Sequence, residues 1–240
     1  MSGHSKWAKL KHTKGVTDAK KSLMFAKLGR MITVAAREAG PDPSSNFKLR
    51  LVMEKAKQIN MPKDNVDRAI KKGAGGAGEA QIENVMYEAY LPGGAALLIE
   101  GLTDNTNRMV SSLRRIFNKY GGSLANQNSV LWMFDRKGIL RLSDLSKISD
   151  REAFELKLID LGAEDIKNED EALAIYASPE NLQKIKEALE QDGLNVDYAE
   201  VEWFAKNYIK INASDQKKVD AIYAELDEDQ DINDYYSNIG

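Results

Sequence analysis

The chain has no cysteine and only two histidines among its 240 residues. The absence of thiols excludes disulfides, thiolate metal sites and a cysteine nucleophile, and it is typical of proteins in a reducing cytosol. His4 and His12 have no cysteine and almost no carboxylate near them in the sequence, whereas Zn²⁺ usually takes three or four such ligands. We therefore expect a cytoplasmic protein with no metal site and no cofactor.

Long hydrophobic runs are also missing. The apolar stretch Ala95–Ile99 is typical of the longest ones, and a membrane helix needs about 20 such residues. Residues 1–15 are polar and basic and lack the apolar centre of a secretory signal. We expect a soluble protein with no membrane partner.

Acidic residues are scarce in the first third of the chain. Residues 1–73 hold 17 Lys and Arg but only 6 Asp and Glu, a net charge of +11. Residues 74–240 hold the other 17 Lys and Arg with 31 Asp and Glu, a net charge of −14. The whole-chain value of −3 hides this division. A basic block beside an acidic block indicates a polyanionic partner, most often nucleic acid.

The basic character is strongest at the start of the chain, where eight Lys and Arg in 30 residues accompany one acid, Asp18. Lysines neutralise phosphates and release counterions, and Trp7 and the histidines can stack on unpaired bases. A solvated face that only keeps the protein soluble is the alternative. The predicted nucleic-acid-binding residues are His4, Lys6, Trp7, Lys9, Lys11, His12, Lys14, Lys20, Lys21, Lys27, Arg30, Lys63, Arg68, Lys71 and Lys72.

Hydrophobic periodicity predicts an α+β fold, in which an all-helical N-terminal domain with an extended basic arm precedes two α/β sandwich domains. We expect helices from residue 17 or 18 to 39, from a Ser44 or Ser45 cap to 59, and from 62 to 72, with Gly73 as the C-terminal cap of the third. Gly73–Gly78 has the composition of a linker. The later pattern predicts strands at 85–91, 95–103, 129–134, 139–142, 172–177, 196–204, 208–211 and 232–236, and helices at 107–119, 152–161, 178–189 and 217–226.

No catalytic pattern emerges. Gly73–Gly78 follows a helix and lacks the Lys-Ser/Thr of a phosphate-binding loop, so a hinge is the better interpretation. Glu88, Glu100 and Asp104 lie in or next to strands without a converging histidine or serine, and we expect them on the surface. Residues 103–108 suit a helix cap by default, with a contact surface as the alternative. We expect no catalytic residue and no small-molecule substrate.

Acidic residues cluster near the C-terminus with no basic residue among them. They are Glu225, Asp227, Glu228, Asp229, Asp231 and Asp234. The cluster suits a solvated end of the protein, a surface that repels nucleic acid and so orients its binding, or a contact for basic protein tails. The sequence leaves these alternatives open.

Several motifs resemble the YebC/PmpR family of bacterial proteins, and together they cover nearly the whole chain. They are GHSKW (Gly3–Trp7), KHTK (Lys11–Lys14), DAKKS (Asp18–Ser22), NMPKDNVDRAIKKGAGG (Asn60–Gly76), YEAYLPGG (Tyr87–Gly94), LTDNTNR (Leu102–Arg108) and SVLWMFDRKG (Ser129–Gly138). Thr13, Phe47 and Thr106 depart from the usual family pattern at single positions.

The resemblance implies three domains: residues 1–78, residues 79–134 completed by 206–240, and an inserted domain at 135–205. It implies a non-enzymatic, DNA-binding regulator of transcription. The alternative is a translation factor that binds ribosomal RNA, since some members of the family are described as acting on the ribosome.

The residues of the basic arm favour binding to nucleic acid without sharp selectivity for its sequence. Lysine dominates over arginine in the basic arm, and lysine is a point charge, whereas arginine makes the bidentate base contacts that specify sequence. No helix has the Arg/Asn/Gln-rich reading face of a helix-turn-helix. A lysine-rich arm with one aromatic suits irregular RNA at least as well as duplex DNA.

Trp7 and its lysine neighbours predict different effects on binding. Trp7→Ala should weaken single-strand binding by roughly 1–3 kcal/mol if the ring stacks on a base, with little change in salt dependence. Lys9→Ala or Lys11→Ala should instead lower the slope of log K against log salt by roughly one each. The alternative is that Trp7 packs in the core. Melting and binding measured on the same Trp7→Ala protein distinguish the two roles, because a lowered melting temperature indicates packing and an unchanged one with weaker binding indicates contact with a base.

Overall fold

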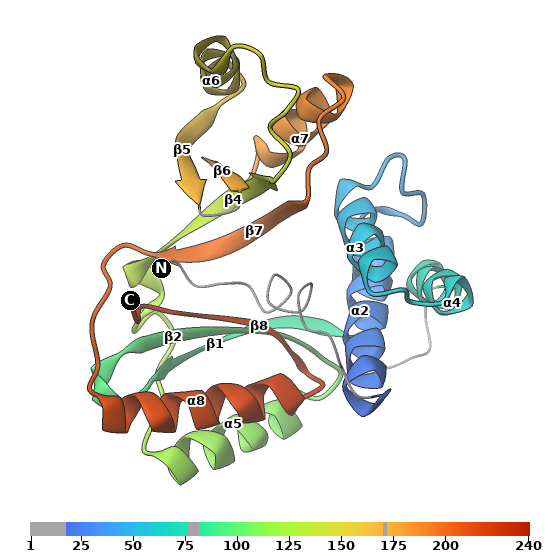
Figure 1. Ribbon diagram of the computed structural model, residues 1–240. Helices are drawn as coiled ribbons and strands as arrows, with labels where there is room; N and C mark the ends of the chain where they lie inside the picture. Colours follow the sequence, from blue (N-terminus) through green and yellow to red (C-terminus); the bar gives the residue numbers. More distant parts are fainter. Residues whose placement is uncertain (1–17, 76–81, 170–171) are drawn as a thin grey trace. The chain divides into compact units, whose positions relative to one another are not determined.

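The computed structural model describes residues 18–75, 82–169 and 172–240, and it separates into two compact units (Figure 1). One unit contains residues up to 134 together with 205–240, and the other contains 135–204. Three helices precede two four-stranded sheets with their own helices, so the α+β prediction is confirmed. The three-domain boundaries at 1–78, 79–134 plus 206–240, and 135–205 stay a prediction.

Three helices form the first part of the larger unit: α2 (Asp18–Ala39), α3 (Phe47–Gln58) and α4 (Lys63–Ala74). Both α3 and α4 pack against α2, on whose apolar face Leu28 and Ile32 are fully buried, as the periodicity predicts (Figure 1). The rest of this core comprises Met24, Ala35, Ala36, Leu49, Val52, Ala56, Met61, Val66 and Ala69.

The cap of α3 differs from the prediction. Asn46, not Ser44 or Ser45, precedes the helix, and its side-chain oxygen accepts the Leu49 N–H at 2.9 Å. The Asn46 amide also donates to the carbonyls of Ala35 and Gly40, which ties the turn to the end of α2. Ser44 is instead held by the Asp42 carboxylate. A serine hydroxyl has one donor hydrogen and cannot donate to two carbonyls, whereas the amide of the buried asparagine can.

Gly73 lies inside α4 and is not its cap, which is Gly75. A Cβ atom at Gly73 would lie 2.3 Å from the Thr33 carbonyl oxygen and 2.8 Å from the Ala36 Cβ. The glycine therefore lets α4 cross close to α2. Thr33 reinforces the crossing, because its hydroxyl donates to the Ala69 carbonyl at 3.1 Å.

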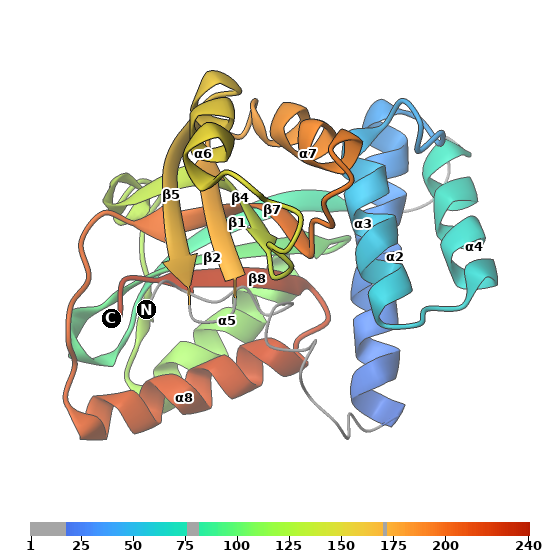
Figure 2. The same cartoon turned by 45° about the horizontal axis from the view of Figure 1, so that its top comes forward.

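The first sheet has the order β3-β1-β2-β8 and is antiparallel throughout. Figures 1 and 2 show its two helices side by side on one face, where their apolar sides close the core. Its elements are β1 (Glu83–Tyr90), β2 (Ala96–Thr103), α5 (Thr106–Tyr120), β3 (Ser123–Leu124), α8 (Ala213–Glu228) and β8 (Ile232–Ser237). The predicted strand at 208–211 is reduced to an isolated bridge between Ile209 and Ile239.

Glu88 explains why the predicted strand at 129–134 is absent. Its buried carboxylate accepts the backbone N–H groups of Asn128, Val130 and Leu131 at 2.6 to 2.9 Å. The backbone curls around this acceptor into a short 3₁₀ turn, Leu131–Met133, before the next strand begins. The prediction that Glu88 lies on the surface is therefore wrong, since its charge orders a loop from inside.

The smaller unit contains most of the second sheet, whose strand order is β5-β6-β4-β7. Its elements are β4 (Phe134–Leu142), α6 (Arg151–Asp160), β5 (Ala163–Glu169), β6 (Ala172–Ala177), α7 (Leu182–Gln191) and β7 (Tyr198–Ala205). The sequence did not reveal β5, because this edge strand is mostly polar and exposed. The helix predicted from 178 begins at Leu182, after a turn closed by the Asn181 N–H on the Ser178 carbonyl.

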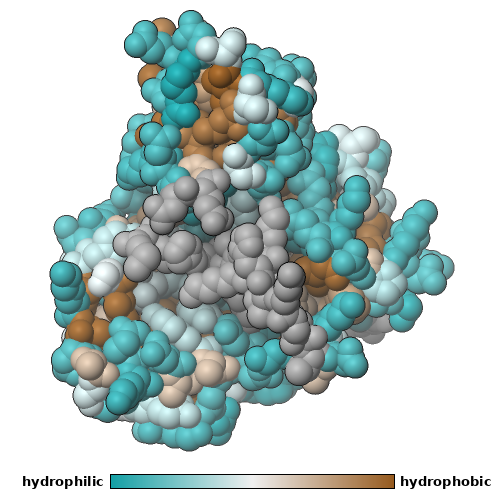
Figure 3. Space-filling model, viewed as in Figure 1, coloured by the Kyte–Doolittle hydropathy of each residue, from teal (hydrophilic) through white to brown (hydrophobic). Residues whose placement is uncertain are grey.

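Hydrophilic residues cover most of the visible surface, and hydrophobic residues show as separate patches (Figure 3). Among the described side chains, the most exposed large hydrophobic ones are Trp132 at 66%, Leu156 at 63% and Ile159 at 57%. Single exposed apolar residues are common in folded proteins. No helix in the described residues is long and apolar enough to cross a membrane.

Two helix glycines predict opposite effects on stability. Gly73→Ala should lower the free energy of unfolding by about 1–3 kcal/mol, because the new methyl group collides with the α2 backbone. Gly29→Ala should leave it unchanged or raise it by about 0.5–1 kcal/mol, because its Cβ meets no described atom within 4 Å outside its chain neighbours and its own helix backbone, and alanine favours the helix. Urea unfolding of both variants tests this. Equal stabilities would contradict the close crossing of α2 and α4.

Candidate nucleic-acid interface

Seven of the predicted binding residues lie outside the described part of the chain. They are His4, Lys6, Trp7, Lys9, Lys11, His12 and Lys14. Their role stays a prediction. The other eight belong to α2 and α4, and the structure divides them into two groups by what they contact.

Lys27 is buried, with 1% of its surface exposed. Its ammonium group donates to the Asp227 carbonyl at 3.1 Å, in the last turn of α8. A cation beside the C-terminal carbonyls of a helix is stabilised by the helix dipole. The expectation that Lys27 meets a phosphate is at odds with this placement, because the side chain has no access to a ligand here.

Arg30 is also committed to contacts inside the larger unit. Its guanidinium donates to the carbonyls of Leu102 at 3.1 Å and Gln230 at 3.3 Å, and it pairs with the Asp231 carboxylate. Arg108 donates to the same carboxylate from the start of α5, at 2.8 to 3.0 Å. With 3% of its side chain exposed, Asp231 is a buried charge shared by two arginines.

Asp104 completes this network at the surface. Arg108 donates to it at 2.6 Å, and this hydrogen bond lowers the pKa of Asp104 below its ordinary value. The segment 103–108 also caps α5, since the Asn105 side chain accepts the Arg108 N–H at 2.9 Å. The default interpretation of this segment as a helix cap is therefore confirmed.

The C-terminal acids are not simply a solvated end. Asp231 and Asp234 are buried, so that hypothesis is wrong for these two residues. Glu225 accepts hydrogen bonds from Lys119 at 2.7 Å, Tyr120 and Arg115, and these contacts lower its pKa to about 2. Several of the negative charges that stand alone in the sequence thus have cationic partners in the fold.

The remaining predicted cations are exposed. Lys20 and Lys21 lie in the first turn of α2, and Lys20 is 3.9 Å from Glu228 in a pair whose members are both more than half exposed. Screening by water makes such a pair weak. The other four are on α4, namely Lys63, Arg68, Lys71 and Lys72. These six cations are the described part of the candidate interface.

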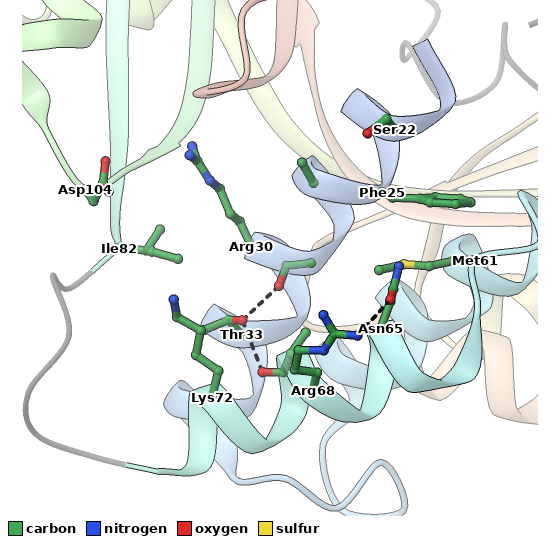
Figure 4. Close-up of a pocket in the computed structure, with 13 residues that line it drawn as sticks. Ser22, Phe25, Arg30, Thr33, Met61, Asn65, Arg68, Lys72, Ile82 and Asp104 are labelled. Atoms are coloured by element: carbon green, nitrogen blue, oxygen red, sulfur yellow. Dashed lines mark hydrogen bonds between the residues drawn. The ribbon is translucent and has the colours of Figure 1, made fainter. Parts of the chain in front are cut away.

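A pocket of about 690 Å³ lies between α2 and α4 (Figure 4). Arg68 and Lys72 enter its lining from α4, and Arg30 enters from α2. The Arg68 guanidinium donates to the Asn65 side chain at 3.3 Å. Asn65 also lines the pocket, and the other lining residues are Ser22, Phe25, Ala26, Gly29, Thr33, Met61, Ala69, Ile82 and Asp104.

Sequence reasoning missed most of this lining. A sequence pattern in α2 could have indicated this wall of the pocket. Small residues recur there at spacings of four, three and four and so share one helix face, namely Ser22, Ala26, Gly29 and Thr33. These residues are small, and the apolar-stripe argument passes over them. Only the packing of α4 beside this face turns it into one wall of a pocket.

Comparisons with known proteins cover almost the whole chain. Residues 5–76 match the model for the TACO1/YebC protein N-terminal domain, and residues 82–239 match the model for the TACO1/YebC second and third domain. A "probable transcriptional regulatory protein" from Fervidobacterium nodosum is 48% identical over 99% of this chain and 93% of its own length. A protein with the same designation from Thermotoga maritima is 46% identical over 99% and 93%.

A solved structure is similar throughout. The crystal structure of a conserved hypothetical protein, Aq1575, from Aquifex aeolicus aligns with a TM-score of 0.83 and 39% sequence identity. The alignment covers 98% of this chain and 96% of that chain. With both family models matched in order along the sequence, the resemblance seen in the motifs is confirmed, and the chain belongs to the TACO1/YebC family.

Proposed function

We propose that this protein is a non-enzymatic, cytoplasmic regulator of gene expression that binds nucleic acid, with DNA as its ligand in the control of transcription. The observation that carries the proposal is the division of charge, +11 in residues 1–73 against −14 in the rest. The relatives designated as transcriptional regulatory proteins support the regulatory role.

The contacts in the fold strengthen this charge argument. Lys27 and Arg30 are used inside the larger unit, whereas the exposed cations at the start of α2 and along α4 face solvent. Among the described residues, Lys63 and Lys71 have neither an ion-pair nor a hydrogen-bond partner. Cations without an intramolecular partner keep their full attraction for a phosphate backbone.

A translation factor that binds ribosomal RNA is the second candidate. It is favoured by the character of the predicted cations that are exposed on α2 and α4, because five of these six are lysines and only Arg68 is an arginine. Lysine contacts position a protein on a backbone, whereas base reading in the major groove relies on bidentate arginine, asparagine or glutamine. The interface therefore suits an irregular RNA surface as well as a promoter.

One experiment separates the two candidates. Binding to promoter DNA is measured beside co-sedimentation with ribosomes, both across a salt series. A transcription regulator should retain promoter binding at salt concentrations that strip it from ribosomes, and a translation factor should show the reverse order. Failure to bind either partner at low salt would contradict the proposal as a whole.

The salt dependence of binding tests which lysines contact phosphate. If about five phosphates are engaged, log K should fall against log salt with a slope of about −3.5 to −4.5. Lys63→Ala and Lys71→Ala should each reduce that slope by roughly one. Lys27→Met serves as the matched control on the buried side of α2, and it should leave the slope unchanged. A slope near zero for the unmodified protein would show that charge does not drive binding.

A further inference from the structure

We propose that the pocket between α2 and α4 holds a single unpaired nucleotide, with its phosphate on Arg68 and Lys72 and its base against the bare wall of α2 at Gly29. The inference rests on the proposed nucleic-acid-binding function and deepens it. It assigns a ligand to a cavity and distinguishes the cations that line the cavity from those that only attract a backbone.

The size of the cavity fits such a ligand. Its volume of about 690 Å³ falls within the range of roughly 300–1,000 Å³ that is usual for small-molecule and cofactor sites. One wall is the small-residue face of α2 and the other is α4, while Phe25 and Met61 supply apolar surface (Figure 4). An apolar wall beside cations is the combination that a base and its phosphate require together.

Gly29 is the most informative residue of the pocket. It lies in the middle of the 22-residue helix α2, where glycine is destabilising relative to alanine. Apart from its chain neighbours and the backbone of its own helix, no atom of the described residues lies within 4 Å of the position that its Cβ would take. Gly73 provides the contrast, because the Thr33 carbonyl 2.3 Å from its Cβ position explains that glycine fully.

Packing within the described protein therefore does not account for Gly29. A ligand that approaches the helix backbone closely does account for it, since close approach is one of the main uses of glycine. Gly29 belongs to the pocket lining, so an added side chain would project into the space that the base is proposed to occupy.

The charges at the pocket favour a phosphate. Arg68 and Lys72 are one turn apart on α4, and both are exposed. The hydrogen bond from Arg68 to Asn65, which also lines the pocket, orients the guanidinium. Arg30 contributes positive potential, although its hydrogen bonds go to Asp231 and two carbonyls. Asp104 is the one carboxylate among the described lining residues, and Arg108 pairs with it. The pocket as a whole is therefore cationic.

An unpaired nucleotide fits better than a paired one. The pocket lies between two helices, so a base must leave its stack to enter it, which costs least in a single strand. Base and phosphate are also present in a free nucleotide. The binding test therefore uses a single-stranded RNA oligonucleotide, a duplex DNA and a nucleoside 5′-monophosphate as separate probes.

Filling the pocket at Gly29 is the central test. Gly29→Met places a flexible, unbranched side chain in open space, so the melting temperature should stay unchanged or rise. Affinity for the single-stranded RNA should fall roughly 5- to 150-fold, the equivalent of the 1–3 kcal/mol typical of one stacked base. Affinity for duplex DNA should not change, because a paired base does not enter. Gly29→Ala should also weaken single-stranded RNA binding without changing duplex DNA binding, but the loss of RNA affinity should be smaller.

Two neighbouring lysines provide the matched control. Lys72 lines the pocket, whereas Lys71, which is next to it in the sequence and is also exposed, does not. Lys72→Ala should therefore weaken single-strand binding more than Lys71→Ala does, while the two variants should weaken duplex binding alike. Melting temperatures of both variants exclude a loss of folding as the cause.

The outcomes separate this inference from the proposed function. If the unmodified protein binds RNA and Gly29→Met binds it equally well, the pocket inference is overturned and nucleic-acid binding stands. If only the monophosphate binds, and Gly29→Met abolishes that binding, the pocket is a free-nucleotide site and the proposed function fails. If no probe binds the unmodified protein, both are overturned.

Discussion

The buried carboxylate of Asp231 is the interaction on which the arrangement of the larger unit depends. A charge with 3% of its side chain exposed is costly unless it is paired, and Arg30 from α2 and Arg108 from α5 together supply that pairing. Lys27 adds a second tie, from α2 to the end of α8. The contacts of Lys27 and Arg30 join α2 to the end of α8 and to the turn after it, some 200 residues later in the chain. The basic helix α2 thus has a structural role in the larger unit in addition to any role in binding.

The same contacts decide which positive charges remain for a ligand. Since α2 turns Lys27 and Arg30 toward carbonyls and a carboxylate of its own unit, the predicted cations that stay accessible are those in its first turn and on α4. Two of these, Arg68 and Lys72, border a pocket, and the others lie on open surface. In the proposed interface, long-range attraction and specific binding therefore belong to different side chains, although all of them contribute to one basic block.

The glycines of the helical part show how stability and binding impose different demands on one residue type. Gly73 is required by the fold, because two helices cross at a distance that leaves no room for a Cβ atom. Gly29 has room for one and costs helix stability. A residue that weakens its own helix without improving the packing is expected where a site needs bare backbone, and the structure places it in the wall of a cavity.

Local chemistry allowed the sequence alone to determine the α+β class, the span of α2, the two strands at 85–91 and 95–103 with a turn between them, and the cap of α5. Periodicity, turn residues and caps act over a few positions and can be read directly. Only tertiary structure decided the burial of Lys27, Glu88 and Asp231, the role of Gly73 inside α4, and the pocket beside Gly29. Each depends on a partner distant in the chain, and the residue type alone does not reveal that partner. From its residue type alone, a lysine or a glutamate is predicted to be exposed. It can be buried only where the fold places an acceptor or a donor close enough to compensate its desolvation.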